Sequence, residues 1–478
     1  MPALLSRLRD ILDDRDIITD RAEAEPYLEE RRGRFRGESD VIVRPRDVAE
    51  VQAVVRACLS EKTSLVPQGG NTGLCGGAVA ESGQVIVSLG RLNKVRHLDR
   101  ANNTMTVEAG CVLADLQIRA RDAHRFFPLS LGAEGSCQIG GNLATNAGGI
   151  NVLRYGNARE QVLGIEAVMP NGELFSDLHG LRKNNTGYDL KQLLIGSEGT
   201  LGVITAATLK LYPHPDQSIT ALAALRDLQS SISFLEYAQS GSGGTLCSFE
   251  LMPRIGLDFA CRHVVGCSDP MTTPHDWYVL LSLQASGDAI DVEILLSRIL
   301  ETAFEAGEIT DAVVASSEQQ AQDLWKLREG LVEGQRFEGG SIKHDISVPV
   351  SKVPEFIDRA SETVTQRVPG IRPCPFGHVG DGNIHFNLSQ PVEMDGTAFL
   401  ALWEEINYLV HDQVAELGGS FSAEHGVGIS KIDEMYRYKD PTALAIMATI
   451  KRALDPDNLF NPGKVIPAPD TDTDTDSR

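Results

Sequence analysis

Three glycine-rich stretches in the first half of the sequence constrain its fold more than any other feature. They read PQGGNTGLCGG (67–77), SLGAEGSCQIGGNLATNAGGINVLRYG (130–156) and IGSEGTLGVIT (195–205). Residues without a Cβ allow tight turns whose backbone N–H groups can point at an anion. The first stretch is not GxGxxG, and no GxxxxGK[ST] occurs, so neither a nicotinamide Rossmann site nor a Walker ATP site is supported. Three such stretches favour a pyrophosphate-linked cofactor over glycines that only make turns.

The composition is that of an ordinary globular protein, with 42% hydrophobic and 23% charged residues over 478 positions. A formal charge of −22 argues against nucleic acid or an anionic membrane as partner. No window approaches 18 consecutive apolar residues, and the N-terminus lacks a secretory pattern, so we expect a cytoplasmic protein without a transmembrane helix. The eight cysteines form no Cys-x-x-Cys pair and are expected to be reduced, with Cys75, Cys111 and Cys137 buried.

The pattern along the chain predicts an α+β protein with more than one domain. Residues 1–213 mix short apolar strands with helices and contain the glycine stretches. Residues 214–423 are rich in helices and contain longer alternating strands, which indicates a domain built on a sheet. Residues 424–466 are expected to complete the active site, and 467–478 to form a disordered acidic tail.

The stretch PFGHVGDGNIHFN (375–387) predicts a β-hairpin with a Gly-Asp-Gly-Asn turn. Such a hairpin brings His378 and His385 to one point. Neutral imidazoles suit Zn²⁺ and similar divalent ions, for which the third ligand is often a carboxylate. Glu424 in SAEHGVG is the candidate third ligand. The alternative, that each histidine makes only local hydrogen bonds, is less favoured for a pair followed by an acid-His-Gly motif.

His425, next to Glu424, is the candidate catalytic base, because an imidazole can accept a hydroxyl proton at neutral pH. Alternatively, His425 contacts a residue that binds the metal, or is itself a spare metal ligand. Gly426 and Gly428 leave room for a substrate and a cofactor to approach closely.

Two cationic side chains are candidates for binding a substrate carboxylate. Lys343 lies on the polar face of the predicted strand SIKHDISVPV, where a solvated lysine is equally expected. Arg328 lies beside the leucine stripe of the predicted helix LWKLREGLVEG, where a surface salt bridge is as common as a bidentate carboxylate contact.

Five of these motifs together resemble one family. PQGGNTGL, IGGNLATNAGG, RKNNTGYDLKQLLIGSEGTLGVIT, GHVGDGNIHFN and SAEHGVG look like the flavoproteins of the vanillyl-alcohol-oxidase type, in the branch that oxidises D-2-hydroxy acids such as D-2-hydroxyglutarate and D-lactate. The resemblance runs in order from about residue 40 to 466. It implies a two-lobed FAD-binding domain at 1–213 and a substrate domain with an antiparallel sheet and flanking helices at 214–423.

The resemblance also implies where FAD binds. The pyrophosphate is expected on the first stretch, the flavin near the second, and the adenine half near Gly202 and Ile204. Asn71 stands where relatives often carry a histidine that attaches flavin covalently, so non-covalent FAD is implied. The expected cofactor contacts are Pro67, Gln68, Gly69, Gly70, Asn71, Thr72, Gly73, Leu74, Ser136, Gly140, Gly141, Thr145, Asn146, Gly148, Gly149, Gly156, Glu198, Gly199, Gly202, Ile204 and Asn461.

For the second domain, the resemblance implies a divalent ion, zinc first, on His378, His385 and Glu424. Arg328, Lys343 and Asn387 are implied as substrate-binding residues, with His425. One departure concerns Val332, where the family pattern has a threonine that helps to hold a distal carboxylate. A valine methyl cannot donate a hydrogen bond, so D-lactate stays open beside D-2-hydroxyglutarate.

The expected reaction is therefore FAD-dependent, metal-assisted oxidation of a D-2-hydroxy acid to the 2-oxo acid. The family suggests an electron-transferring flavoprotein or a quinone as acceptor, and a homodimer is compatible with the sequence. A zinc hydrolase without flavin, and a flavin- or ligand-binding protein without turnover, are the alternatives from other classes. The sequence does not separate Zn²⁺ from Mn²⁺ or Co²⁺.

Overall fold

The computed structural model describes residues 1–31 and 33–466. The acidic tail expected at 467–478 lies outside the described residues. The chain divides into two compact units. Of the described residues, the first unit contains those of 1–149, 156–213 and 424–466, and the second contains 150–155 and 214–423. The short segment 150–155, expected in the first domain, is therefore part of the second unit. No helix within the described ranges is long and apolar enough to cross a membrane.

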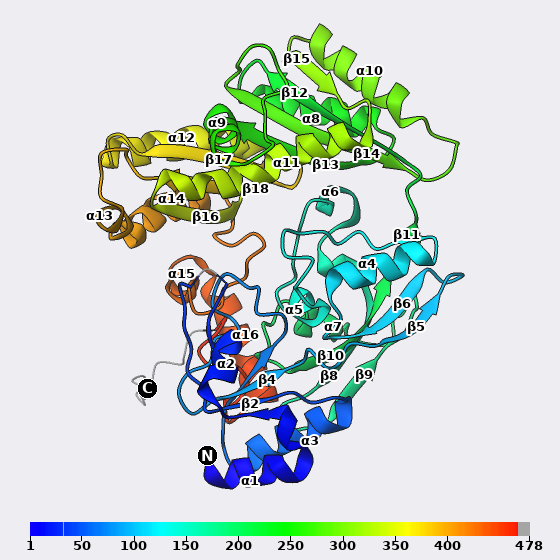
Figure 1. The fold of residues 1–478 in the computed structure, drawn as a ribbon, viewed down its shortest axis with the longest axis vertical. Helices are drawn as coiled ribbons and strands as arrows, with labels where there is room; N and C mark the ends of the chain where they lie inside the picture. Colours follow the sequence, from blue (N-terminus) through cyan, green and yellow to red (C-terminus); the bar gives the residue numbers. More distant parts are fainter. Residues whose placement is uncertain (32, 467–478) are drawn as a thin grey trace. The chain divides into compact units, whose positions relative to one another are not determined.

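The first sheet of the first unit contains three parallel strands (Figure 1, blue). Its order is β1 (Ile17–Ile18), β2 (Val41–Val43), β4 (Val85–Ser88) and β3 (Leu65–Gln68). The parallel strands are apolar along most of their length because their side chains alternate into two buried clusters, one on each face. Helix α3 (Val48–Ser60) connects β2 to β3 and begins at Asp47, whose carboxylate accepts the N–H of Glu50.

A second, antiparallel sheet completes the first unit. Its order is β5 (Val95–Asp99), β6 (Thr104–Glu108), β10 (Val203–Lys210), β8 (Val162–Val168) and β9 (Leu174–Asp177). The central strand, β10, has the sequence VITAATLK and is buried over all but its last residue, because strands flank it on both sides. Small and β-branched residues suit such a position.

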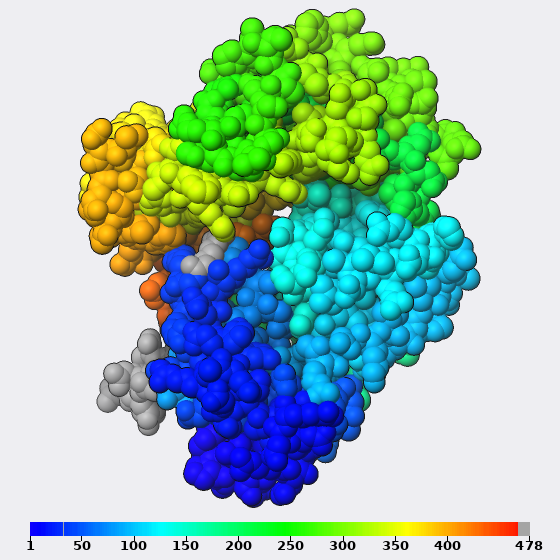
Figure 2. Space-filling model, viewed as in Figure 1, coloured from blue at the N-terminus to red at the C-terminus, as the bar shows by residue number. Residues whose placement is uncertain are grey.

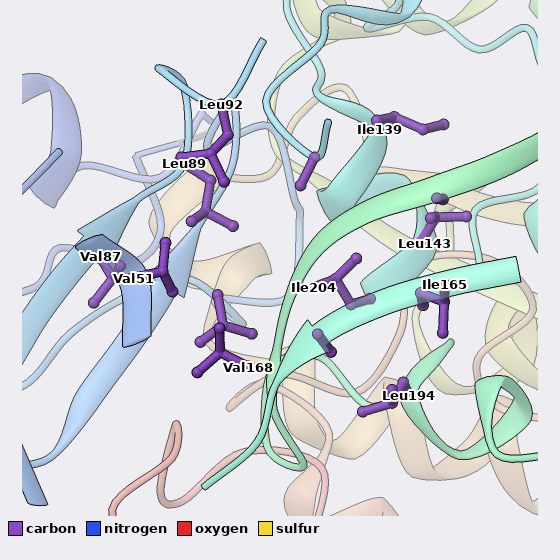
Figure 3. Close-up of a cluster of buried hydrophobic side chains, with 14 of the residues drawn as sticks. Val51, Val87, Leu89, Leu92, Ile139, Leu143, Ile165, Val168, Leu194 and Ile204 are labelled. Atoms are coloured by element: carbon purple, nitrogen blue, oxygen red, sulfur yellow. The ribbon is translucent and has the colours of Figure 1, made fainter. Parts of the chain in front are cut away.

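One hydrophobic core joins these two sheets (Figure 3). Val51 and Val87 extend into it from the side of the parallel sheet, and Ile165 and Val168 from the antiparallel sheet. Ile204 lies in the same core and is only 5% exposed. Its side chain is therefore committed to packing, and only its backbone is left for the cofactor role that the resemblance implies.

The other elements of the first unit surround this core. Helix α1 packs against α3 and forms part of the surface that is dark blue in Figure 2. These other elements of the first unit are α1 (Pro2–Ile11), η1 (Asp14–Asp16), α2 (Arg21–Leu28), α4 (Leu113–Asp122), β7 (Arg125–Phe126), α5 (Ile139–Ala144), η2 (Ala158–Gln161), α7 (Lys191–Leu194), β11 (Tyr212–Pro213), α15 (Ile432–Tyr438) and α16 (Pro441–Leu454).

The C-terminal segment extends the parallel sheet that the N-terminal residues build. The N–H of Leu65 donates to the carbonyl of Leu459, and the N–H of Asn461 donates to the carbonyl of Leu65, at 2.8 Å each. Lys451 is buried beside them and donates to the carbonyls of Thr200 and Phe460. The first unit is thus closed by residues from both ends of the chain.

The second unit is built on a seven-stranded antiparallel sheet (Figure 1, green to yellow). Its order is β15 (Ile309–Val314), β12 (Gln217–Leu225), β14 (Trp277–Ala285), β13 (Leu246–Pro253), β17 (Arg372–His378), β18 (Asn383–Ser389) and β16 (Ser341–Ser347). The inner strands are buried on both faces, so they are almost continuously apolar. A polar residue on such a strand needs a partner inside the protein.

Helices cover both faces of this sheet, but unequally. The larger cluster lies under α8, α10, α12 and α14. The smaller one lies under α9 and α11 and includes the leucine stripe that the sequence predicts on α11, namely Leu324, Leu327 and Leu331. The helices are α6 (Val152–Tyr155), α8 (Ser230–Gly241), α9 (Arg254–His263), α10 (Val292–Glu305), α11 (Glu318–Gly334), η3 (Gln335–Glu338), η4 (Val350–Lys352), α12 (Val353–Arg367), η5 (Val379–Asp381), α13 (Gly396–Leu400) and α14 (Trp403–Glu416).

The cysteines allow a direct test of this packing. All eight are free, and Cys75, Cys111 and Cys137 are buried as predicted. Burial raises the pKa of the Cys58, Cys247 and Cys374 thiols to about 12. Cys261 and Cys267 are only half-buried.

We expect iodoacetamide at pH 8 to modify Cys261 and Cys267 before the buried thiols, because the thiolate is the reactive form and the reagent must reach it. Peptide mass spectrometry of the native protein, with a denatured sample as control, measures the order. Modification of Cys374 as fast as Cys267 would contradict the packing described above.

Candidate active site

The predicted hairpin is present, and it brings the two histidines together. Strands β17 and β18 pair antiparallel, with Phe376 opposite His385 and His378 opposite Asn383. His378 and His385 therefore project from the same face, and their ring centroids are 5.6 Å apart. The turn contains Gly382 at φ +84°, where a Cβ would lie 2.2 Å from the carbonyl oxygen of Val348. Glycine is required there by both conformation and space.

A buried glutamate that the sequence analysis did not single out holds His378. Glu250 lies opposite His378 in the β13–β17 ladder, and its Oε1 is 2.6 Å from Nδ1 of His378. Its other oxygen, Oε2, accepts from Nε of Arg328 at 3.0 Å and lies 2.9 Å from Nη2. The side chain of Glu250 is 1% exposed. A single glutamate in the apolar strand LCSFELMP is the signal that could have identified it.

The charge of Glu250 is stable at neutral pH. Burial alone would raise the pKa of this carboxyl group, but the neighbouring His378 and Arg328 outweigh burial and lower the pKa to about 2. Removing one partner from a buried pair of this kind costs about 3–5 kcal/mol, because a charge is then left without compensation. Loss of either Glu250 or Arg328 would therefore destabilise the protein, because the other charge would stay buried without its partner.

His385 has a carboxylate neighbour of its own. Asp345 lies directly opposite it in the β16–β18 ladder, with 3.9 Å between Oδ1 and the Nδ1 of His385. Asp345 is buried, and its Oδ1 accepts from the amide of Asn383 at 3.0 Å. Like Glu250, Asp345 was given no role by the sequence analysis, although the strand pattern placed it on this polar face.

The predicted substrate-binding residues share the face of the sheet that carries the histidines. Lys343 and Asn387 are directly opposite each other in β16 and β18. The amide nitrogen of Asn387 donates to Gln335, which in turn donates to Ser389, so the orientation of Asn387 is fixed inside the protein.

Arg328 is a buried residue, which excludes the surface salt bridge considered from the sequence. It is 7% exposed, and its guanidinium carbon lies 4.8 Å from the ring centre of Phe376. Nε and Nη2 face Glu250, and within the described chain no residue accepts a hydrogen bond from Nη1. Val332, one turn further along α11, packs beside the smaller apolar cluster.

In the first unit, the first two glycine stretches lie against each other. A Cβ on Gly70 would be 2.2 Å from the carbonyl oxygen of Ser136, and one on Gly69 would touch Gln138. Around Gly73 and Gly141, by contrast, an added Cβ would meet no atom within 4 Å. The two stretches thus form a joint surface whose backbone is open at these two glycines. A backbone surface of this kind fits a pyrophosphate.

Several other predicted cofactor residues have a clear internal role. The amide of Gln68 donates to the carbonyls of Tyr27 and Ala78, and that of Asn71 donates to the carbonyl of Glu29. Gly140 and Gly149 are needed for close backbone packing, at Ala109 and Ser130 respectively. Internal hydrogen bonds are also made by the side chains of Ser136, Thr145, Asn146 and Asn461. Positive φ angles occur at Gly156, Glu198, Gly199 and Gly202.

The carboxylate of Glu198 holds the segment that contains the predicted acid and base. It accepts the N–H of Val427 at 2.7 Å and the N–H of Gly428 at 2.9 Å. Burial raises the pKa of this carboxyl group, and the two backbone hydrogen bonds partly offset that effect. The carboxylate of Glu198 thus fixes the loop after His425, and its expected contact with the cofactor stays a prediction.

The same segment rests on the first glycine stretch. The N–H of Ile429 donates to the carbonyl of Cys75 at 2.9 Å, and a Cβ on Gly428 would be 2.0 Å from that oxygen. At the start of the segment, the carboxylate of Glu424 lies beside Gly148 in the second stretch. Glu424 and His425 are thus attached to both glycine stretches, with 3.5 Å between Oε1 of Glu424 and Nε2 of His425.

Glu424 is also tied to the histidine-bearing sheet through the covalent chain. The preceding residue, Ala423, donates its N–H to the carbonyl of Asp345, which is the ladder partner of His385. Consecutive Cα atoms are about 3.8 Å apart. Glu424 therefore begins next to the strand that faces His385, whatever the arrangement of the two units.

Comparison with known proteins agrees with the division of the chain into an FAD-binding part and a second part. Residues 39–177 match a family described as "FAD binding domain", and residues 214–465 match "FAD linked oxidases, C-terminal domain". The chain is similar over nearly its whole length to proteins named D-2-hydroxyglutarate dehydrogenase. The one from Xanthomonas citri pv. viticola is 37% identical, with 95% of both chains covered. The mitochondrial one from Arabidopsis thaliana is 36% identical, with 97% of this chain and 81% of the relative covered.

Solved structures confirm the expected fold. A p-cresol methylhydroxylase matches with a TM-score of 0.75 at 17% identity, covering 96% of both chains. A 4-ethylphenol oxidase from Gulosibacter chungangensis matches with a TM-score of 0.71 at 19% identity, covering 97% of both. The chain belongs to the FAD-linked oxidases and is an FAD-linked oxidoreductase with the α+β, vanillyl-alcohol-oxidase-type fold.

Proposed function

We propose that this protein oxidises D-2-hydroxyglutarate to the corresponding 2-oxo acid. The support is the name shared by relatives that match nearly the whole chain at 36–37% identity, together with two cationic side chains, Lys343 on strand β16 and Arg328 on helix α11. The substrate has two carboxylates, and Arg328 and Lys343 are the cations that would bind them. Asn387, held in place by Gln335, would complete the binding surface.

FAD would lie on the joint surface of the two glycine stretches, where the backbone at Gly73 and Gly141 is open. When bound, the flavin supplies the acceptor for the hydride of the substrate α-carbon. Non-covalent binding is proposed because Asn71 has no nucleophilic atom and its amide already donates to Glu29.

His378, His385 and Glu424 would hold a divalent cation, zinc first. These three residues are the ligand set that the sequence motifs and the family resemblance imply. Two imidazoles and a carboxylate leave a coordination position open for substrate, as catalytic metal sites require. A bound cation would polarise the substrate hydroxyl group. His425 would accept the hydroxyl proton.

The observation that carries the proposal is the double attachment of the Glu424–His425 segment. Glu198 and Cys75 hold it to the glycine stretches, and Ala423 anchors it beside the ladder partner of His385. This continuity would allow the segment to supply an acid and a base to both the cofactor and the metal. A zinc hydrolase without flavin has no support from the family to which the chain belongs.

D-lactate is the second candidate substrate, and Val332 is the observation that favours it. The side chain cannot donate a hydrogen bond, and it lies one turn after Arg328 on the same face of α11. D-lactate has no distal carboxylate and so does not need such a donor.

The remaining proposals rest on the family resemblance. An electron-transferring flavoprotein or a quinone would accept the electrons. The cytoplasmic location and the homodimer stay predictions from the sequence. Among the relatives, those from Arabidopsis thaliana and Bos taurus are named as mitochondrial.

His425→Ala should abolish substrate-dependent bleaching of the flavin, because removal of a general base costs about 10²–10⁴-fold in rate. Anaerobic stopped-flow absorbance with D- and L-2-hydroxyglutarate measures it, with the exposed His179→Ala as matched control. FAD and zinc contents should stay at the wild-type level. Equal bleaching by both enantiomers, or by His425→Ala protein, would contradict the proposed reaction.

Removal of the metal should stop turnover reversibly. Dialysis against a chelator is expected to leave FAD absorbance intact and to abolish oxidation, with recovery on addition of Zn²⁺. His378→Ala and His385→Ala should each lose bound zinc in elemental analysis, since two protein ligands hold a divalent ion poorly. Full activity in a zinc-free preparation would exclude the metal from the reaction.

Val332→Thr should lower KM for D-2-hydroxyglutarate by roughly tenfold, the effect of one hydrogen bond of about 1.4 kcal/mol to a carboxylate. KM for D-lactate should not change, because that substrate lacks the second carboxylate. Steady-state kinetics with both substrates test this expectation. If the ratio of the two KM values were the same in Val332→Thr as in the wild type, Val332 would not select the substrate.

A further inference from the structure

One buried carboxylate bonds to two residues with different proposed roles. Glu250 contacts His378, a proposed metal ligand, through Oε1, and Arg328, a proposed substrate-binding residue, through Oε2. All three side chains come from different elements, β13, β17 and α11, and all are almost fully buried. Neither the metal nor the substrate would need to touch Glu250, so its position calls for another explanation.

The contact with His378 selects one form of the imidazole. A carboxylate 2.6 Å from Nδ1 requires a proton on that nitrogen. In the neutral ring the lone pair is then on Nε2, which is the form that a metal ion binds. Metal-binding histidines commonly donate their other N–H to a carboxylate, which fixes the ring and strengthens the ligand.

The contact with Arg328 fixes the guanidinium group. Its Nε and Nη2 face Glu250 while its plane lies near the ring of Phe376. The group cannot rotate without breaking these contacts, so Nη1 keeps one direction. A guanidinium held in this way is ready to receive a carboxylate without further loss of side-chain freedom.

We infer that Glu250 is a positioning residue that couples metal binding to recognition of the substrate carboxylate. It orients His378 for the metal with one oxygen and Arg328 for the substrate with the other. The inference rests on the proposed function, since it assumes that His378 binds the ion and Arg328 the acid.

Glu250→Gln tests the inference, because it keeps the shape of the side chain and removes its charge. The chain offers a control in Glu338, a half-buried carboxylate of the same unit that also bonds a histidine, His263, and an arginine, Arg372, and pairs with the exposed Arg262. Arg372 is the first residue of β17 and His378 is the last, so Glu338 and Glu250 bond opposite ends of the same strand. Each variant is prepared with FAD bound, stripped of metal, and titrated with Zn²⁺ against a chromogenic chelator.

The expected result is a loss of zinc affinity of about 10–100-fold in Glu250→Gln and none in Glu338→Gln. At saturating zinc, Glu250→Gln should raise KM for D-2-hydroxyglutarate by roughly tenfold and change kcat less, because a bidentate contact to a charged group is misplaced. The melting temperature is expected to fall in both variants, and further in Glu250→Gln, since only the ion pair of Glu250 is buried. Glu250→Asp, which retains the charge on a shorter side chain, should show an intermediate zinc affinity.

The outcomes separate the two proposals. Wild-type protein that binds no zinc, or that does not oxidise D-2-hydroxyglutarate, overturns the proposed function. Wild-type protein that does both, with Glu250→Gln unchanged in zinc affinity and KM, overturns the positioning role alone. If Glu250→Gln does not fold, the aspartate variant decides, because wild-type zinc affinity in that variant would contradict the inference.

Discussion

The pair of hydrogen bonds from Val427 and Gly428 to the carboxylate of Glu198 is the constraint on which the site depends. The segment from Glu424 to Gly428 has no regular secondary structure of its own. Without a fixed anchor, such a segment would lose the position of its acid and its imidazole to conformational entropy. A buried carboxylate that satisfies two adjacent N–H groups supplies that anchor, and glycine at 426 and 428 provides the positive φ angles that bring both N–H groups to it.

Two buried carboxyl groups, Glu198 and Glu250, have different effects in this protein. The carboxylate of Glu198 accepts hydrogen bonds from two backbone N–H groups, and burial outweighs these bonds and the charges of Lys431 and Lys464, so its pKa is raised. Glu250 meets an arginine and a histidine, so its pKa falls despite complete burial. The first carboxyl group fixes a loop and the second connects three elements of a sheet domain. The difference follows from the partners, because the degree of burial is nearly the same.

The fold and part of the site could be predicted from the sequence because they depend on local patterns. Turn residues between two alternating strands identified the hairpin of His378 and His385, and helical spacing identified the leucine stripe of α11. The roles of Glu250 and Glu198 could not be read in this way. Their partners are 128 and about 230 positions away, and spacing along the chain does not reveal which strands become neighbours.

The closure of the first unit by residues such as Leu459 and Asn461 has a consequence for biosynthesis. The sheet that contains Val41–Val43 cannot gain its last backbone hydrogen bonds until residues 459–461 have left the ribosome. The second unit, in contrast, comes mainly from the continuous stretch 214–423 and can mature earlier. Domains tend to fold as they are translated, and contacts between distant positions form slowly. The nascent FAD-binding half must therefore wait, partly assembled, for its own C-terminal residues.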